Sequence, residues 1–214
     1  AASNVARLAD ALRLMIAAVK REPRPASTPS PAPDRLATEW LAESYFQQAG
    51  GELDAALKAA RQAADKSPRF ALAWVRVAEL EFGFARTDAA VAALESGLAL
   101  GPRNAQALAL KGFLVSARNR IPSARSLFDQ AIVLDGGLGN AWLGRGLCRI
   151  RQGDGEGGLR DLEVAAAVEP QRAVLRSYLG KAFSLVRDHS HARAELELAK
   201  ALDPADPTAW LYSA

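Results

Sequence analysis

The sequence predicts an all-α solenoid in which antiparallel helix pairs repeat with a period of about 34 residues. Three series of residues keep one constant interval, the step from Pro68 to Pro102. The first consists of Pro68, Pro102, Pro170 and Pro204, with Gly136 in the remaining slot. The second consists of Trp40, Trp74, Leu108, Trp142, Arg176 and Trp210, and the third of Ala63, Gly97, Ala131, Ala165 and Ala199. A fixed period of this length is typical of stacked repeats, in which each unit buries its apolar face against the next.

The N-terminal residues differ in character from the repeats. Residues 1–22 are predicted to form an amphipathic helix, whose apolar side holds Val5, Leu8, Leu12, Met15, Ile16 and Val19. Residues 23–36 contain five prolines and are predicted to form an extended linker. The first residues lack the basic start and the unbroken apolar stretch of a signal peptide.

Five repeat units are predicted over residues 37–204, each with two helices and two turns. The units are 37–70, 71–104, 105–138, 139–172 and 173–206, and residues 207–214 begin a sixth. In the second unit, helices are predicted over 71–84 and 87–100. Thr87 is expected to cap the second of these helices, because its hydroxyl can accept an unpaired backbone amide. Gly101-Pro102 is expected to end it, since proline cannot continue a helix.

The residues of the second unit resemble the tetratricopeptide repeat. That family places a large residue, small residues, an alanine, a leucine or aromatic residue and a closing proline at fixed steps. Here they are Trp74, Ala78, Ala90, Leu94, Gly97 and Pro102. The resemblance covers residues 37–204 and implies a right-handed superhelix whose first helices line a concave groove. The fifth unit departs from the pattern at Arg176. The fourth has Gly158 where alanine is usual, which is expected to weaken that helix by about 1 kcal/mol.

The composition gives little support for catalysis. Basic and acidic residues are interspersed, and the net charge is +3. His189 and His191 are expected to lie in an exposed helix start with Asp188 rather than at a metal. The stretch 153–158 lacks the lysine and hydroxyl residue of a phosphate loop. Cys148 is the only cysteine and is expected to be buried. No run of 18 apolar residues occurs. We therefore predict a non-enzymatic protein with no cofactor, no catalytic or metal-binding residues and no membrane span.

The resemblance implies that inward-facing side chains of the first helices contact a partner. The predicted groove residues are Tyr45, Arg76, Glu79, Phe82, Phe113, Asn140, Leu143, Arg151, Tyr178 and Lys181. Aromatic and arginine side chains often dominate interface energetics, although Phe82 and Phe113 are equally consistent with the core. Some family members hold the C-terminal carboxylate of a chaperone with lysine and asparagine. The corresponding positions here are Leu41, Tyr45, Arg76, Gln106 and Leu110, so no such clamp is predicted.

These features predict a protein–protein interaction scaffold that binds a peptide or helix in the groove, as part of a larger protein. One alternative is self-association into a homo-oligomer, through the N-terminal helix or through the apolar face around Trp210 and Leu211. Another is binding of nucleic acid or a different anionic polymer through the 21 arginines, which is disfavoured because no dense basic block occurs. The compartment stays open between the cytoplasm and a bacterial cell envelope, because residues 203–214 resemble segments of bacterial repeat proteins.

Overall fold

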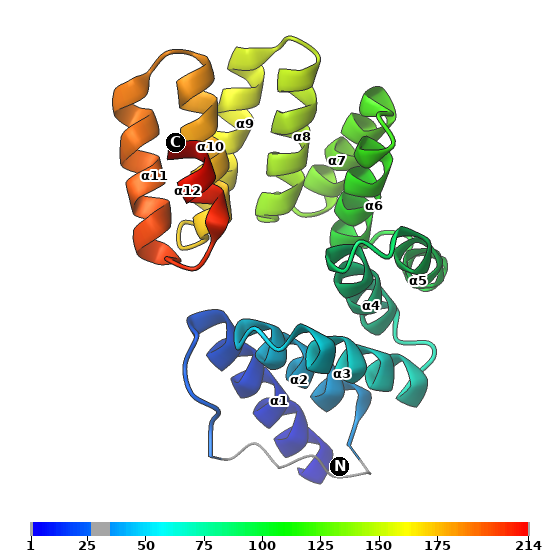
Figure 1. Cartoon of the computed structure of the whole chain (residues 1–214). Helices are drawn as coiled ribbons and strands as arrows, with labels where there is room; N and C mark the ends of the chain where they lie inside the picture. The colour runs from blue at the N-terminus through cyan, green and yellow to red at the C-terminus, as the bar shows by residue number, and fades with distance from the viewer. Residues whose placement is uncertain (1, 27–34, 214) are drawn as a thin grey trace. The chain divides into compact units, whose positions relative to one another are not determined.

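The structure is a computed structural model that describes residues 2–26 and 35–213. These residues form twelve α-helices and no strand (Figure 1). The first helices of the pairs are α2 (Ala37–Ala49), α4 (Ala71–Gly83), α6 (Ala105–Ala117), α8 (Gly139–Arg151) and α10 (Ala173–Leu185). The second helices are α3 (Leu53–Lys66), α5 (Thr87–Leu100), α7 (Ile121–Leu134), α9 (Gly155–Val168) and α11 (His189–Leu202). Helix α1 (Ala2–Lys20) precedes the pairs, and α12 (Pro207–Ser213) follows them.

The predicted all-α class, built of antiparallel helix pairs, is confirmed. The starts of the first helices recur at the constant interval of the sequence series, and so do the starts of the second helices. The chain divides into two compact units, Ala1–Pro102 and Arg103–Ala214, here called unit 1 and unit 2. Part of the predicted proline-rich linker, residues 27–34, lies outside the described residues.

A hydrogen bond explains why the tryptophan and proline series run in parallel. The indole Nε1 of Trp74 donates to the Pro68 carbonyl oxygen at 2.9 Å, six residues earlier. Trp142 makes the same bond to Gly136 at 2.8 Å, and Trp210 makes it to Pro204 at 3.2 Å. Because the acceptor is a backbone carbonyl, glycine can replace proline at 136. Arg176 supplies its Nε as the donor to the Pro170 carbonyl at 3.3 Å, so it takes over the role of the indole.

The turn inside each helix pair also repeats. One residue of each turn has a positive φ angle, and it occupies the same position in all five pairs. These residues are Gly51, Ala85, Asn119, Gly153 and Arg187. Glycine and asparagine adopt this left-handed conformation readily, whereas a side chain such as that of Ala85 is strained there. The predicted cap at Thr87 is wrong. Thr87 is the first residue of α5, and the N-cap is Arg86, which makes no side-chain capping bond.

Unit 1 contains buried charged residues that are paired within the unit. Helix α1 packs on α2 through Ala11 and Leu14, which contact Ala42. Beside this contact, Arg7 Nε of α1 donates to Glu39 Oε1 of α2 at 3.0 Å. Glu39 is buried, and a buried charge is costly unless it is paired. Arg7 supplies that partner within the unit.

Unit 2 is built around a fully buried aromatic ring. Phe128 of α7 packs where α6 and α8 carry glycines. A Cβ atom at Gly112 would lie 2.7 Å from the Phe128 ring, and one at Gly144 would lie 2.1 Å from it. Phe113 meets the same ring edge-on, with the centroids 4.9 Å apart. The small residues in the repeat frame therefore make room for a large one on the second helix.

A pair of glycines brings α8 and α9 close together. A Cβ atom at Gly158 would lie 2.8 Å from the Gly146 carbonyl oxygen and 2.4 Å from Ile150 Cγ1. An alanine methyl group at 158 would therefore meet the backbone of Gly146, so the helix propensity of alanine is opposed here by close helix packing.

Candidate peptide-binding pocket

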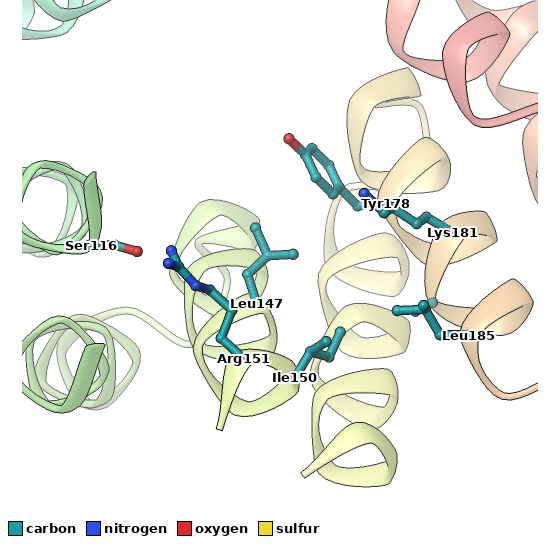
Figure 2. A pocket seen from close by; sticks show the side chains of 8 residues that line it. Ser116, Leu147, Ile150, Arg151, Tyr178, Lys181 and Leu185 are labelled. Carbon is teal, nitrogen blue, oxygen red and sulfur yellow. The ribbon is translucent and has the colours of Figure 1, made fainter. Parts of the chain in front are cut away.

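Unit 2 contains a pocket of about 280 Å³ lined by three first helices. The lining residues are Ser116 of α6; Leu147, Ile150 and Arg151 of α8; and Tyr178, Lys181, Ala182 and Leu185 of α10. Figure 2 shows Arg151 extending from α8 toward Ser116, while Tyr178 and Lys181 lie across the pocket on α10. The predicted groove residues Arg151, Tyr178 and Lys181 are thus brought together.

The repeat frame explains how these residues converge. Leu147 and Lys181 occupy the same position in consecutive pairs. Ser116 and Ile150 share a second position. Leu147 lies three and four residues before Ile150 and Arg151, and Tyr178 lies three and four residues before Lys181 and Ala182, so each set lies on one side of its helix. A pocket that follows the first helices is therefore a direct consequence of the repeat.

The charged groups of the pocket are cationic. Arg151 is exposed, and its Nη2 donates to Asn119 Oδ1 at 2.9 Å. Lys181 is also exposed, with its Nζ 4.3 Å from the centre of the Tyr212 ring. No aspartate or glutamate is among the described residues that line the pocket. The site therefore favours a ligand with negative charge.

Tyr178 gives the pocket a half-buried aromatic wall. Its ring meets Tyr212 of α12 edge-on, with the centroids 5.7 Å apart. Burial raises the pKa of the Tyr178 hydroxyl above its ordinary value of 10.0, and a hydrogen bond with Tyr212 adds to the shift. The hydroxyl therefore donates its proton to Tyr212, and its oxygen lone pairs can accept a hydrogen bond.

The predicted groove residues of unit 1 form an internal network. Arg76 is only 3% exposed. Its Nε donates to Ser44 Oγ at 3.0 Å, and its Nη2 donates to Gln48 Oε1 at 2.6 Å. Its guanidinium lies 4.0 Å from the centre of the Tyr45 ring, and Nη1 pairs with Glu79 Oε2 at 3.2 Å. The structure thus places Arg76 between α4 and α2 as a bridge. Phe82, the fourth predicted residue of this unit, is half-buried.

The remaining predicted residues of unit 2 lie away from the pocket lining. Leu143 is buried in the apolar core with Leu162 and Leu175. Phe113 is half-buried and packs on both apolar clusters of the unit. Asn140 accepts a hydrogen bond from Arg172 Nη2 at 3.0 Å through its Oδ1.

Five lining residues are absent from the predicted set. They are Ser116, Leu147, Ile150, Ala182 and Leu185, and they are small or aliphatic. The prediction favoured aromatic and charged side chains, so it passed over the residues that form the apolar surface. Their positions in the first helices could have identified them, because Ile150 and Leu185 lie on the last turns of α8 and α10.

Other chemically notable residues have structural surroundings. Asp188 caps α11 by accepting from the His191 backbone N–H at 3.2 Å, and His191 Nδ1 lies 2.7 Å from Asp188 Oδ2. Cys148 is buried as expected, and burial raises the pKa of its thiol. Within residues 2–26 and 35–213, no cluster of His, Cys, Asp and Glu has the arrangement of a metal site. No helix in the same ranges combines the length and apolar character needed to cross a bilayer.

A second hollow, of about 530 Å³, lies in unit 1 at the start of α2. Lys66 and Arg69 line it together with Thr38 and Ser67. The α2 N-terminus is already capped there, since the Leu36 N–H donates to Glu39 Oε2 at 2.6 Å. This arrangement uses the positive end of the helix for a residue of the chain itself.

Solved structures share this architecture at low sequence identity. A thermophilic TPR protein from Thermus thermophilus superposes with a TM-score of 0.70 and 20% identity, over 83% of this chain and 97% of its own. PilW, a widely conserved type IV pilus biogenesis factor, gives 0.64 and 20% over 82% of each chain. YrrB, a TPR protein with an unusual peptide-binding site, gives 0.50 and 17% over 83% and 91%. No protein-family model matches the sequence, and neither does any curated protein. The shared architecture establishes that this chain has the tetratricopeptide-repeat fold.

Proposed function

We propose that the chain is a non-catalytic interaction scaffold that binds a segment of a protein partner in the pocket between α6, α8 and α10. The observation that carries the proposal is the convergence of Arg151, Tyr178 and Lys181 around an aliphatic surface. Aromatic and cationic anchors beside apolar surface are typical of protein interfaces. YrrB, which has a similar fold, is described as having a peptide-binding site.

The pocket chemistry defines the segment that fits. A volume of about 280 Å³ is small for a cofactor site and suits one or two side chains. Leu147 and Ile150 offer apolar contact, while Arg151 and Lys181 offer positive charge. The segment therefore carries a bulky apolar side chain next to an aspartate or glutamate. The Tyr178 hydroxyl oxygen can accept a hydrogen bond from a backbone N–H of the segment.

Fluorescence anisotropy with three labelled peptides tests this proposal. The first peptide has leucines flanked by aspartates, the second has asparagine in place of aspartate, and the third has lysine. The aspartate peptide is expected to bind best, and Lys181→Glu is expected to weaken it about tenfold, equivalent to about 1.4 kcal/mol. Arg193→Glu on α11 is the matched control, because Arg193 is exposed and lies outside the pocket lining.

Two results would overturn the proposal. Equal binding of the aspartate and lysine peptides would remove charge selection from the site. If both Lys181→Glu and Tyr178→Ala bound the aspartate peptide as well as the wild type does, the peptide would bind outside the pocket.

Internal ion pairing argues against the nucleic-acid alternative. At least twelve arginines pair with carboxylates of the same chain, including Arg61, Arg145 and Arg172. Such arginines are less available to phosphates than unpaired ones. A labelled oligonucleotide that bound the chain with a steep salt dependence would revive this alternative.

A further inference from the structure

Helix α1 has two apolar sides with different surroundings. One side, with Ala11 and Leu14, packs on α2. The other is a row of large aliphatic residues that are 46% to 85% exposed in the described part of the chain. We call this row the α1 stripe, and its members are Val5, Leu8, Leu12, Ile16 and Val19. Five exposed aliphatic side chains on one helix form a continuous apolar surface, which on soluble proteins marks an interaction site.

The spacing of the stripe indicates which kind of surface it fits. Its residues follow one another in steps of three, four, four and three, which averages 3.5 residues per step. This is the period of a coiled-coil seam. Val5, Leu12 and Val19 lie seven residues apart and take the a positions, Leu8 takes a d position, and Ile16 takes an e position. Valine at a with leucine at d favours two-stranded assemblies.

The charges of α1 argue against a membrane surface as the binding partner of the α1 stripe. Three of its basic residues lie within 4 Å of a carboxylate. The pairs are Arg7–Glu39, Arg13–Asp10 and Lys20–Glu22. A helix that binds anionic lipid keeps its cations available on the polar face and often has aromatic residues on the apolar face. The stripe has no aromatic residue and no charge, so a second apolar stripe is its best complement.

We propose that two copies of this chain associate through their α1 stripes, which pack as a short two-stranded coiled coil. The contact of α1 with α2 and the Arg7–Glu39 pair fix the rotation of α1, so the stripe is presented without rearrangement. The exposed parts of the five residues amount to on the order of 500 Å² per copy, so their complete burial would remove roughly 1,000 Å² in total, which is in the range of weak, transient interfaces. The dimer is therefore weak and depends on protein concentration.

Sedimentation equilibrium of the full chain tests the proposal. The wild-type mass is expected to rise from 22.7 kDa toward twice that value as concentration increases through the micromolar range. Leu12→Glu, at the centre of the stripe, is expected to hold the mass at 22.7 kDa at every concentration. Val133→Glu is the matched control, because Val133 is an isolated aliphatic residue on α7 that is 86% exposed. The Val133→Glu variant is expected to dimerise like the wild type.

Circular dichroism of Leu12→Glu checks that α1 remains folded, and Ile16→Lys takes its place if it does not. A wild-type mass that stays at 22.7 kDa would overturn the proposal, as would folded stripe variants that dimerise like the wild type. Flotation with vesicles of phosphatidylcholine and phosphatidylserine provides a further arm. Wild-type flotation that Leu12→Glu abolishes, without any dimer in solution, would assign the stripe to membranes instead.

Discussion

Units 1 and 2 follow the same repeat frame, but different chemistry fills equivalent buried positions. Position 39 of unit 1 is a glutamate, whereas the equivalent Ala73 of the same unit and Ala107, Ala141 and Leu175 of unit 2 are apolar and buried. Position 76 is a buried arginine, whereas the equivalent Leu110 is aliphatic. The frame therefore determines where a side chain is buried, and the local neighbour determines whether it is charged.

The neighbour of the buried glutamates of α2 is the segment around α1. Glu39 receives Arg7 of α1. Glu43 accepts hydrogen bonds from Arg24 at 3.0 Å and from Arg35 at 3.1 Å. Arg24 precedes residues 27–34 in the sequence, and Arg35 follows them. In unit 2 the buried carboxylate is Asp161 of α9, which accepts from Arg145 and Arg149 of α8 at 2.7 Å and 3.1 Å, while Phe128 and the aliphatic clusters form the apolar core. The comparison predicts that the two units respond to different perturbations.

Phe128→Ala is expected to have the largest effect and to act on unit 2. The fully buried ring fills the space left by two glycines, so its removal leaves a cavity that costs about 3–5 kcal/mol. Hydrogen exchange with mass spectrometry should show lost protection in α6, α7 and α8. Val133→Ala on the same helix is the control and should change stability by less than about 0.5 kcal/mol. Equal loss of protection in α2 and α3 would contradict a distinct core in unit 2.

Glu43→Gln is expected to have the next largest effect and to act on unit 1. The substitution keeps the shape of the side chain but removes the charge that accepts from Arg24, Arg35 and Gln47. The buried Arg35 then loses its ion pair, at a cost of about 2 kcal/mol. Urea unfolding followed by hydrogen exchange should locate the loss in α1 and α2. Arg160→Gln removes an exposed pair with Glu156 and should be nearly neutral.

Acid should reproduce part of the Glu43→Gln effect in the wild type. Burial by itself raises the pKa of Glu43, but hydrogen bonds from Arg24 and Gln47 and the nearby arginine charges outweigh burial and lower the pKa. A lowered pKa in the folded state stabilises the fold fully above the ordinary value of 4.5, and this stabilisation is lost as pH falls through the folded-state pKa. Protection in α1 and α2 should therefore fall before protection in α7. The reverse order would contradict the ionic account of unit 1.

Gly158→Ala tests whether close helix packing outweighs helix propensity in unit 2. The new methyl group would meet the Gly146 carbonyl, which is backbone and cannot turn away, so we expect a loss of about 1–2 kcal/mol. Gly155→Ala in the same helix is the control, because its methyl group would meet nothing within 4 Å. Thermal unfolding should show a lower Tm for the first variant and an unchanged or higher Tm for the second. A stabilising Gly158→Ala would restore the expectation from propensity alone.

The sequence predicts the helix pairs well, because three series of residues in one frame report the same period. It predicts Arg151, Tyr178 and Lys181 of the pocket because charged and aromatic residues at inward positions are conspicuous. It could not show that Arg76 is buried, since this depends on Ser44 and Gln48 of the preceding first helix. Nor could it show the fit of Phe128 against Gly144, which lies one repeat further along the chain.

The smallest expected effect concerns the turn that both units share. Ala85 in unit 1 has φ 58°, where its side chain is strained, while Gly51 occupies the equivalent turn with φ 84°. Ala85→Gly relieves the strain but gives the unfolded chain more freedom, so we expect a gain of only about 0.5 kcal/mol. Gly51→Ala is the converse variant and should lose about 1 kcal/mol for the same reason. Urea midpoints of the two variants should move in opposite directions. Parallel shifts would mean that the turn conformation contributes nothing, and that the repeat period depends on the helix contacts alone.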